Sequence, residues 1–374
     1  MQSAPAIVMV TGSLEAGGAE RVFADMANYW NRKGWRITLA TWAGTCTEDF
    51  YELDHGVQRV WLNVDANNAS LSAKFLAHAR RIRKLRRLIA NSKPNAVLSF
   101  IDTSNVMTLL ACTGLRPRVI VSERVNGAGY ASIPLVWRAS RIATYWRADA
   151  VVAQTQDAAR WIAKLCGVTP VVIPNPLRAL PETDSPRQSI VLAVGRLTHQ
   201  KGFDLLLRAF AGLEQELANW RLVIIGSGSE HSALRSLTEQ LKLGDRIELL
   251  APVKDIESWM GLAGLVVQPS RFEGFPNVIL EAMGMGAAVI SADCRSGPAE
   301  MIKDRVNGRL VPVEDVATLT QVMSELMRNP QERIRLGNEA KKVRQIFRQD
   351  LVMRQWESCV MPALSQGGSV PLAD

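Results

Sequence analysis

The alternation of short apolar runs with amphipathic stretches constrains the fold of this chain more than any other feature. Short apolar runs bounded by glycine, proline or polar residues are typical of strands that are buried on both faces. Because helical stretches separate these runs, we predict an α/β fold with parallel sheets covered by helices on both faces. The runs lie at residues 6–11, 37–41, 96–100, 119–122, 150–153, 171–173, 189–194, 222–225, 247–250, 265–268 and 288–291. Residues 307–311, NGRLV, predict a last short strand after an Asn-Gly turn.

The length of the chain predicts two domains. A single hydrophobic core rarely grows beyond about 250 to 300 residues, and this chain has 374. Residues 174–188, PNPLRALPETDSPRQ, contain four prolines and little periodicity, which indicates a linker. We therefore predict one domain over 1–180 and another over 181–345, with a ligand site in the cleft between them.

The composition narrows the class of protein. The chain is 47% hydrophobic and 21% charged, and it has no uncharged apolar run long enough to span a bilayer. The first residues lack the basic region of a signal peptide. The five cysteines are scattered without a CxxC pair and the four histidines form no close ligand pair, so we expect a reducing cytosol and no metal site. The net charge of +8 favours an acidic partner, which would be nucleic acid, anionic lipid or a phosphorylated substrate.

The segment 268–302 joins an apolar run, a Gly/Pro turn, a helix and a second apolar run. Glu273 in the turn and Glu281 in the helix are eight positions apart, about two helical turns, so both could face one bound molecule. Backbone N–H groups at Asn277 and Val278, in the first helical turn, could hold a phosphate. A pair of glutamates at this spacing also fits two solvated or capping side chains. The turn between them contains Gly274, Phe275 and Pro276.

Three glycine-bearing loops follow predicted strands. In the loop after 189–194, Gly195 precedes Arg196, and Lys201 stands five positions later, where both cations could reach one diphosphate. Two solvated surface cations are the alternative. Gly226 follows strand 222–225, and Gly17 and Gly18 precede the first helix, where each would let a ligand approach the backbone or would simply form a tight turn.

Taken together, the segment from 190 to 310 resembles the retaining glycosyltransferases of family 4. The resemblance implies a GT-B architecture, in which two Rossmann-like domains face each other across a cleft and a final helix, here 346–374, returns to the first domain. It implies that Arg196 and Lys201 bind the donor diphosphate, that Glu273 contacts the donor sugar and that Glu281 contacts the ribose. Glu273, Arg196 and Lys201 are then the catalytic candidates. Gly17 and Gly18 would touch the donor phosphate or the acceptor, and Phe347 and Trp356 could anchor the final helix on the first domain.

The first domain departs from the family pattern in one place. Many family members have a histidine at the end of a strand here, but this chain has none between His78 and His199. The corresponding residues 122–126 are SERVN, and polar side chains at the carboxyl ends of parallel strands are typical of ligand sites. We expect Glu123, Arg124 or Asp102 to serve at the acceptor site, with Glu123 also a catalytic candidate. The SER segment resembles the bacterial subgroup of amylovoran and protein N-glycan hexosaminyltransferases.

One predicted helix concentrates the positive charge, because no acidic residue occurs between Asp65 and Asp102. Such an amphipathic helix could lie on an anionic membrane, or its apolar stripe could pack on the sheet while the cations face water. Nucleic-acid binding is a third reading, but no nucleic-acid-binding motif accompanies the charge. The membrane candidates are Lys74, Arg80, Arg83, Lys84, Arg86 and Arg87. A second basic and aromatic segment fits an interfacial surface or ordinary packing: Trp137, Arg138, Arg141, Tyr145, Trp146 and Arg147.

The resemblance implies the reaction as well. We expect retaining, metal-independent transfer of a hexose or N-acetylhexosamine from a nucleotide diphosphate sugar, with no cofactor, UDP as the first choice and GDP as the second. The expected acceptor is a polyprenyl-diphosphate-linked saccharide or a polysaccharide at the inner face of the cytoplasmic membrane, with no nucleic-acid partner. The alternative function is a nucleotide-sugar-binding or epimerase-like GT-B protein without transferase activity.

Overall fold

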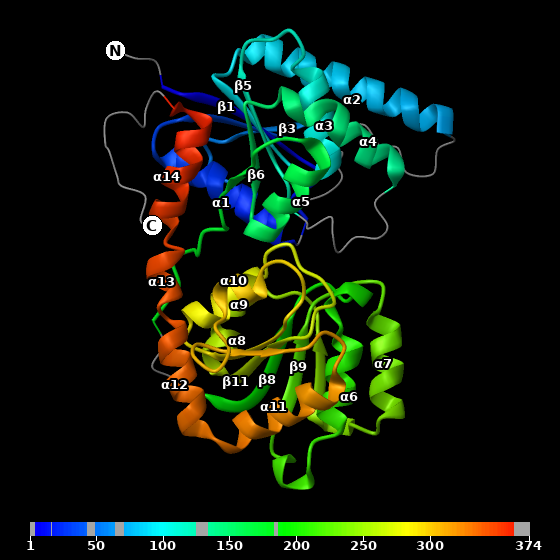
Figure 1. Cartoon of the computed structure of the whole chain (residues 1–374), viewed down its shortest axis with the longest axis vertical. Helices are drawn as coiled ribbons and strands as arrows, with labels where there is room; N and C mark the ends of the chain where they lie inside the picture. Colours follow the sequence, from blue (N-terminus) through cyan, green and yellow to red (C-terminus); the bar gives the residue numbers. More distant parts are fainter. Residues whose placement is uncertain are drawn as a thin grey trace. The chain divides into compact units, whose positions relative to one another are not determined.

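A computed structural model of the chain describes residues 4–15, 17–42, 49–63, 71–124, 134–182 and 186–362. The chain divides into two compact units. Unit 1 comprises Met1–Pro174 and Asp350–Asp374, and unit 2 comprises Asn175–Gln349. Both are built around a parallel sheet (Figure 1).

The sheet of unit 1 has seven strands in the order β3-β2-β1-β4-β5-β6-β7, all paired in parallel. The strands are β1 (Ala6–Thr11), β2 (Arg36–Thr41), β3 (Gln58–Trp61), β4 (Ala96–Phe100), β5 (Arg118–Ser122), β6 (Ala150–Ala153) and β7 (Val171–Val172). The helices are α1 (Gly18–Arg32), α2 (Leu71–Ser92), α3 (Asp102–Ala111), α4 (Leu135–Thr144), η1 (Tyr145–Arg147), α5 (Gln156–Cys166) and α14 (Gln349–Val360).

Alternate residues of the central strands of unit 1 serve two cores. Met9 belongs to the core that contains Trp30 of α1 and Trp356 of α14. Val10, which points to the opposite face, belongs to the core that contains Leu85 of α2. The sheet is therefore covered on both faces, which is why its central strands are uninterrupted apolar runs.

The sheet of unit 2 has six parallel strands in the order β10-β9-β8-β11-β12-β13. The strands are β8 (Gln188–Val194), β9 (Arg221–Ile225), β10 (Ile247–Leu250), β11 (Ala263–Gln268), β12 (Ala288–Ala292) and β13 (Arg309–Val311). The helices are η2 (His199–Lys201), α6 (Phe203–Ala211), η3 (Gln215–Leu217), α7 (His231–Gln240), η4 (Gly244–Arg246), α8 (Ile256–Leu262), α9 (Asn277–Gly284), α10 (Pro298–Met301), α11 (Val316–Arg328), α12 (Pro330–Ala340) and α13 (Val343–Ile346).

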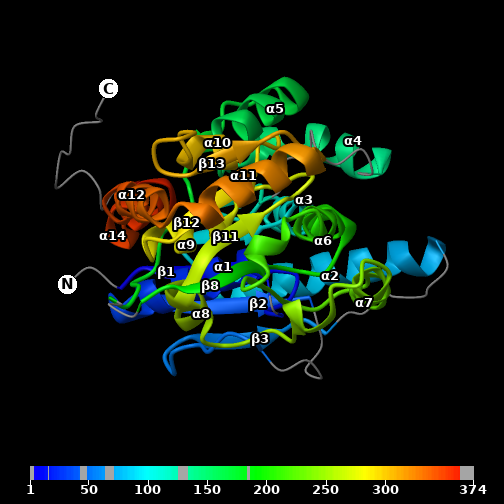
Figure 2. The same ribbon diagram turned by 90° about the horizontal axis from the view of Figure 1, so that it is seen from below.

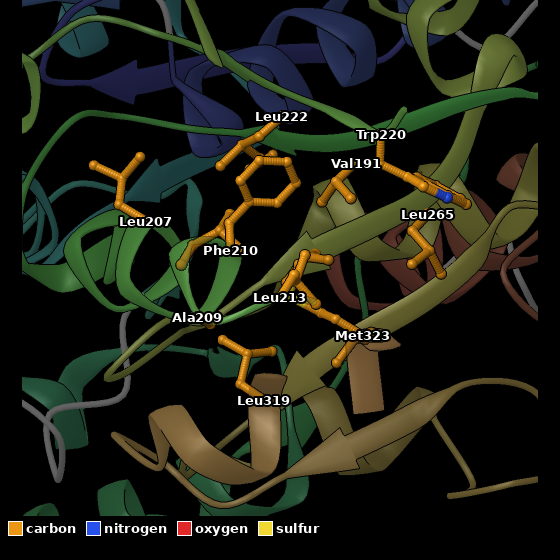
Figure 3. Close-up of a cluster of buried hydrophobic side chains, with 14 of the residues drawn as sticks. Val191, Leu207, Ala209, Phe210, Leu213, Trp220, Leu222, Leu265, Leu319 and Met323 are labelled. Carbon is orange, nitrogen blue, oxygen red and sulfur yellow. The ribbon is translucent and has the colours of Figure 1, made fainter. Parts of the chain in front are cut away.

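Two cores flank this second sheet as well. One contains Phe210 of α6 and Met323 of α11, and Figure 3 shows side chains from these helices gathered with residues of β8, β9 and β11. The other contains Met260 of α8, Ile279 of α9 and Val343 of α13. The helices thus lie on both faces, as in unit 1.

The end of the chain corrects one expectation from the sequence. Phe347 precedes α14 and belongs to a core of unit 2, where its ring lies 6.1 Å from that of Phe275. The expectation that Phe347 anchors the final helix on the first domain is therefore wrong. Trp356 packs in unit 1, with its ring 5.8 Å from that of Phe100.

Each sheet has one point at which the strand order reverses. In unit 1 the point lies between β1 and β4, and in unit 2 it lies between β8 and β11. Figure 2 shows β8 and β11 side by side. Loops that leave the carboxyl ends of two such strands run in opposite directions and leave a crevice where open α/β sheets bind ligands.

Candidate functional site

The loops that follow β8 and β11 come together at the switch point of unit 2. Gly202 ends the loop after β8 with φ at +65°, a left-handed conformation that favours glycine. A Cβ at Gly202 would lie 2.2 Å from the carbonyl oxygen of Pro269, in the loop after β11. Only glycine permits this close approach of the two backbones.

Glu273 and Lys201 meet across these two loops. Lys201 Nζ donates to Glu273 Oε1 at 2.6 Å. The same oxygen accepts from Ser270 Oγ at 2.6 Å and from Gln268 Nε2 at 3.4 Å. Glu273 is only 5% exposed, so these donors offset the cost of burying its charge. The structure thus brings together two of the predicted site residues and adds Gln268 and Ser270, which the sequence patterns did not identify.

Arg196 lies in the same loop as Lys201 but in a different environment. Its side chain is exposed, and Nη2 donates to Gln200 Oε1 at 3.4 Å. Gln200 Nε2 in turn donates to the carbonyl oxygen of Phe272, beside Glu273. Arg196 is therefore a solvent-facing cation in the same loop as the partly buried Lys201.

Gly226 determines how the loop after β9 packs against the loop after β8. A Cβ on Gly226 would lie 1.9 Å from the carbonyl oxygen of Gly195. This contact is too short for any side chain. Gly226 thus lets the loop after β9 approach the backbone of Gly195 directly.

The helix α9 begins beside Glu273, as predicted. Phe275 and Pro276 are buried, whereas Gly274, Asn277 and Val278 are partly exposed. Asn277 Oδ1 accepts from Asn175 Nδ2 at 2.6 Å. Glu281 is buried in the second turn of this helix. Ile279 and Leu280 of the same helix pack in the core.

Cys294 follows β12 and lies near the Lys201–Glu273 pair. Burial is the largest cause that raises the pKa of this thiol to about 12, and the charge of Glu273 adds to the effect. The sulfur is therefore protonated at neutral pH and is a poor nucleophile.

In unit 1, Arg141 of α4 joins two of the predicted acceptor residues. Its Nε donates to Glu123 Oε1 at 2.8 Å, and its Nη2 lies 3.0 Å from Asp102 Oδ2. The hydroxyl of Tyr145 also donates to Glu123 Oε1. Burial raises the pKa of Glu123, and Arg141 opposes that rise.

The two carboxylates differ in access to solvent. Glu123 is 2% exposed, whereas the side chain of Asp102 is 27% exposed and its Oδ1 accepts from the backbone N–H of Thr103. Ile101, immediately before Asp102, has φ at +75°. This is a strained conformation for a β-branched residue, and such strain clusters at functional sites.

Arg124 lies next to Glu123 in the sequence but is separate from the Arg141 network. Its guanidinium carbon stacks 4.0 Å from the centre of the Phe100 ring. Burial lowers the pKa of Arg124 to about 9, and the charge of Glu20 opposes that change. This buried cation was predicted at a strand end, but its aromatic partner was not.

The predicted glycines at the start of α1 form a tight junction. Gly17 immediately precedes the helix, and Gly18 is its first residue. The Tyr51 hydroxyl donates to the carbonyl oxygen of Gly17 at 3.0 Å and accepts from its N–H at 3.2 Å. The peptide at Gly17 is therefore held in place by a side chain that the sequence did not suggest.

The basic residues of α2 fall into two groups. Lys84 Nζ donates to the carbonyl oxygen of Leu62 at 2.7 Å, and Arg86 Nη1 donates to that of Ala111 at 2.9 Å, so both tie the helix to its neighbours. Arg80, Arg83 and Arg87 form the second group: they are exposed, as Lys84 and Arg86 are, but within the described residues they make no such hydrogen bond to a neighbouring element. The side chain of Lys74 lies outside the described residues.

The second basic and aromatic segment also divides between surface and interior. Arg141 and Tyr145 are buried and Trp137 is half-buried, whereas Arg138, Trp146 and Arg147 are exposed. Within the described ranges, no three His, Cys, Asp or Glu side chains are grouped so that they could hold a metal ion. None of the described helices is both long enough and apolar enough to cross a membrane.

Family models match both halves of the chain. The model described as "Glycosyltransferase Family 4" matches residues 16–178, and "Glycosyl transferases group 1" matches residues 181–343. Together they cover the sheet of unit 2 and the sheet of unit 1 except β1, and α14 lies outside both matches.

Among curated proteins, the chain is similar over nearly its full length to two bacterial glycosyltransferases. It is 25% identical to amylovoran biosynthesis glycosyltransferase AmsD of Erwinia amylovora, covering 94% of this chain and 97% of the relative. It is 27% identical to GalNAc-alpha-(1->4)-GalNAc-alpha-(1->3)-diNAcBac-PP-undecaprenol alpha-1,4-N-acetyl-D-galactosaminyltransferase of Campylobacter jejuni, covering 94% and 96%.

Solved structures show the same fold. Sucrose-phosphate synthase of Thermosynechococcus elongatus has a TM-score of 0.84 at 18% identity, covering 97% of this chain and 100% of the other. Anabaena Alr3699/HepE, solved in complex with UDP and glucose, has a TM-score of 0.81 at 20% identity, also covering 97% and 100%. The fold is the expected GT-B fold, and the chain belongs to the glycosyltransferases that combine a family 4 domain with a group 1 domain.

Proposed function

We propose that the chain is a retaining glycosyltransferase that moves a hexose or N-acetylhexosamine from a nucleotide diphosphate sugar to a lipid-linked or polysaccharide acceptor. The contact between Lys201 and Glu273 carries the proposal. In the proposed site Lys201 would face the leaving phosphate and Glu273 would accept from sugar hydroxyls, and the contact supports this because it joins loops from the two strands at the switch point.

Departure of the nucleotide diphosphate builds negative charge on the β-phosphate. That charge would be stabilised by Lys201, Arg196 and the amino-terminal turn of α9. Removing one such contact typically raises the barrier by about 3 kcal/mol, which lowers the rate about a hundredfold. Because these groups supply fixed positive charge, we expect the reaction to proceed without an added metal ion.

The sugar would be held between two glutamates. Glu273, fixed by donors from Lys201 and Ser270, would accept hydrogen bonds from sugar hydroxyls and stabilise the positive charge that develops on the ring. Glu281 would accept from the ribose hydroxyls.

We propose a front-face transfer. The bond between the anomeric carbon and the β-phosphate oxygen breaks, and the bond to the acceptor oxygen forms on the same face. The proton of the acceptor hydroxyl passes to the leaving phosphate. The protonated state of Cys294 and the hydrogen bonds that occupy Glu273 Oε1 favour this route over a covalent intermediate.

The acceptor side is proposed to lie in unit 1, at the ends of β4 and β5. Asp102 is the more exposed carboxylate and would contact an acceptor hydroxyl. Glu123 would act through Arg141, and Arg124 would supply positive charge close by. The exposed cations of α2, Arg80, Arg83 and Arg87, are proposed to face anionic lipid at the inner side of the cytoplasmic membrane.

A polyprenyl-diphosphate-linked saccharide is the proposed acceptor and UDP the proposed donor nucleotide, with GDP second. The Campylobacter relative is named for an undecaprenol-linked substrate, and the Anabaena protein was solved with UDP. Both names support these choices. A thermal-shift panel of UDP and GDP sugars would identify the nucleotide, because a ligand that binds only the folded state raises Tm.

Product analysis tests the reaction. Radiolabelled UDP-sugar is incubated with the protein and a polyprenyl-linked acceptor, and label should enter the organic-extractable fraction. Glu281→Ala should abolish this transfer, whereas Glu239→Ala, at an exposed carboxylate of α7, should not. Free or epimerised nucleotide sugar as the sole product would instead support a non-transferase GT-B protein.

A further inference from the structure

The helix α4 buries polar side chains and exposes apolar ones, which is the reverse of an ordinary surface helix. Its polar residues Arg141 and Thr144, with Tyr145 of η1, are buried. Its apolar residues face solvent, because Leu135 is 78%, Val136 64% and Ile142 49% exposed. A surface helix normally buries its apolar side, so this arrangement leaves a set of large apolar side chains without a protein core.

The exposed side chains follow the helical repeat. Leu135, Arg138, Ile142 and Trp146 are spaced by three, four and four positions, which places them on one face. Trp146 continues this face into η1 and is 69% exposed. We call Leu135, Val136, Ile142 and Trp146 the α4 apolar face.

The charged residues within α4 and η1 are all positive. Residues 135–147 contain no acidic side chain, and Arg138 and Arg147 are exposed among the apolar residues. The Arg147 guanidinium lies 5.7 Å from the centre of the Trp146 ring. Apolar and aromatic side chains mixed with arginine match the boundary of an anionic bilayer, where the apolar groups contact acyl chains and the cations contact headgroups.

The basic helix α2 lies beside the α4 apolar face. Trp137 of α4 packs edge-on against His78 of α2, with ring centres 5.5 Å apart. Leu76 of α2, two residues before His78, is 55% exposed. Figure 1 shows both helices in unit 1, and the residues of α2 include no acidic side chain.

We infer that the α4 apolar face inserts into the interface of an anionic membrane, while the exposed arginines of α2 and α4 bind lipid headgroups. The inference deepens the proposed function, on which its biological purpose rests. It also gives a reason for the reversed helix. One side of α4 holds Arg141 against Glu123 and Asp102, and the other side would hold the bilayer, so lipid contact and the proposed acceptor site share one rigid element.

Vesicle flotation tests the inference. The full chain is mixed with vesicles of equal parts phosphatidylglycerol and phosphatidylcholine. The double variant Leu135→Ser, Ile142→Ser should bind at least about tenfold more weakly, since full burial of one such side chain corresponds to roughly ten- to a hundredfold in affinity. The control is Ile334→Ser, Ile346→Ser, at two residues of α12 and α13 that are 61% and 65% exposed; it should bind as the wild type does.

Salt dependence separates insertion from charge attraction. The double variant of α4 should keep the wild-type loss of binding with rising salt, whereas Arg83→Glu should reduce that dependence. Wild-type binding by the α4 variant, or no vesicle binding by the wild-type chain, would overturn the inference. A dimer in light scattering that the α4 variant abolishes would assign the face to a second copy and would also overturn it.

The thermal shift with UDP distinguishes this inference from the proposed function. If UDP raises the Tm of the wild type and of the α4 variant equally, the donor side is intact and flotation alone decides the role of α4. If UDP and GDP give no shift while flotation behaves as described, the donor assignment fails and the membrane surface stands.

Discussion

Lys201 Nζ lies 2.6 Å from Glu273 Oε1, although the two residues are 72 positions apart in the chain. The contact exists because β8 and β11 are neighbours in the sheet and the loops that follow them come together. A lysine predicted to bind phosphate and a glutamate predicted to bind sugar thus become one unit. The consequences of this arrangement can be tested at several positions.

Gly226→Ala should disturb the proposed donor site by displacing the loop that follows β8. The new Cβ would lie 1.9 Å from the carbonyl oxygen of Gly195, so the backbone must move, at a cost of roughly 1–3 kcal/mol. We expect a lower Tm and weaker UDP binding in thermal-shift titrations. Gly212→Ala is the control, because its nearest contact is 3.4 Å from Thr320 Cγ2, and an unchanged Gly226→Ala protein would contradict the packing described.

Arg141→Ala should destabilise the fold strongly. It leaves Glu123, which is 2% exposed, without its cationic partner, and breaking a buried pair in this way costs about 3–5 kcal/mol. Urea unfolding measures the loss. The exposed pair of Arg160 and Asp157 provides the control, since Arg160→Ala should cost less than about 1 kcal/mol. Equal losses in the free energy of unfolding for the two substitutions would show that the Arg141 network stabilises the fold no more than an exposed ion pair does.

Glu123 should make stability fall as pH rises. Burial raises the folded-state pKa of Glu123 above its ordinary value of 4.5, so the folded chain holds this proton more tightly than the unfolded chain. The stabilisation from this tighter proton binding is fully present below pH about 4.5, and it is lost as the pH rises through the pKa of Glu123 in the folded state. Glu123→Gln cannot ionise, so the free energy of unfolding of wild type minus variant should decrease across this window. A difference that is constant with pH would contradict the assignment.

The strands and the loops of the proposed donor site could be predicted because their signals are local. Buried parallel strands are continuous apolar runs, and the segment from Gly195 to Gly202 contains both its cations and its turn residues. By contrast, β3 was not predicted, because its four residues Gln58–Trp61 are partly or largely exposed at the sheet edge and show no apolar run.

The side-chain partners could not be predicted, because tertiary packing selects them. Nothing near Glu123 in the sequence indicates that Arg141, 18 positions away, would be buried against it. Arg141 and Ile142 are neighbours in one basic and aromatic segment, yet the first is buried and the second is exposed. The orientation of α4 against α3 and α5 separates its buried polar side from its exposed apolar side.

The most direct test of the donor site is the rate of sugar transfer by Lys201→Ala. Its matched control is Lys342→Ala, which removes a Lys–Glu pair of the same 2.6 Å length between Lys342 and Glu339 on the protein surface. With radiolabelled UDP-sugar and a polyprenyl-linked acceptor, Lys201→Ala should lower kcat about a hundredfold or more while Lys342→Ala keeps the wild-type rate. A folded Lys201→Ala protein with full transfer activity would contradict the account.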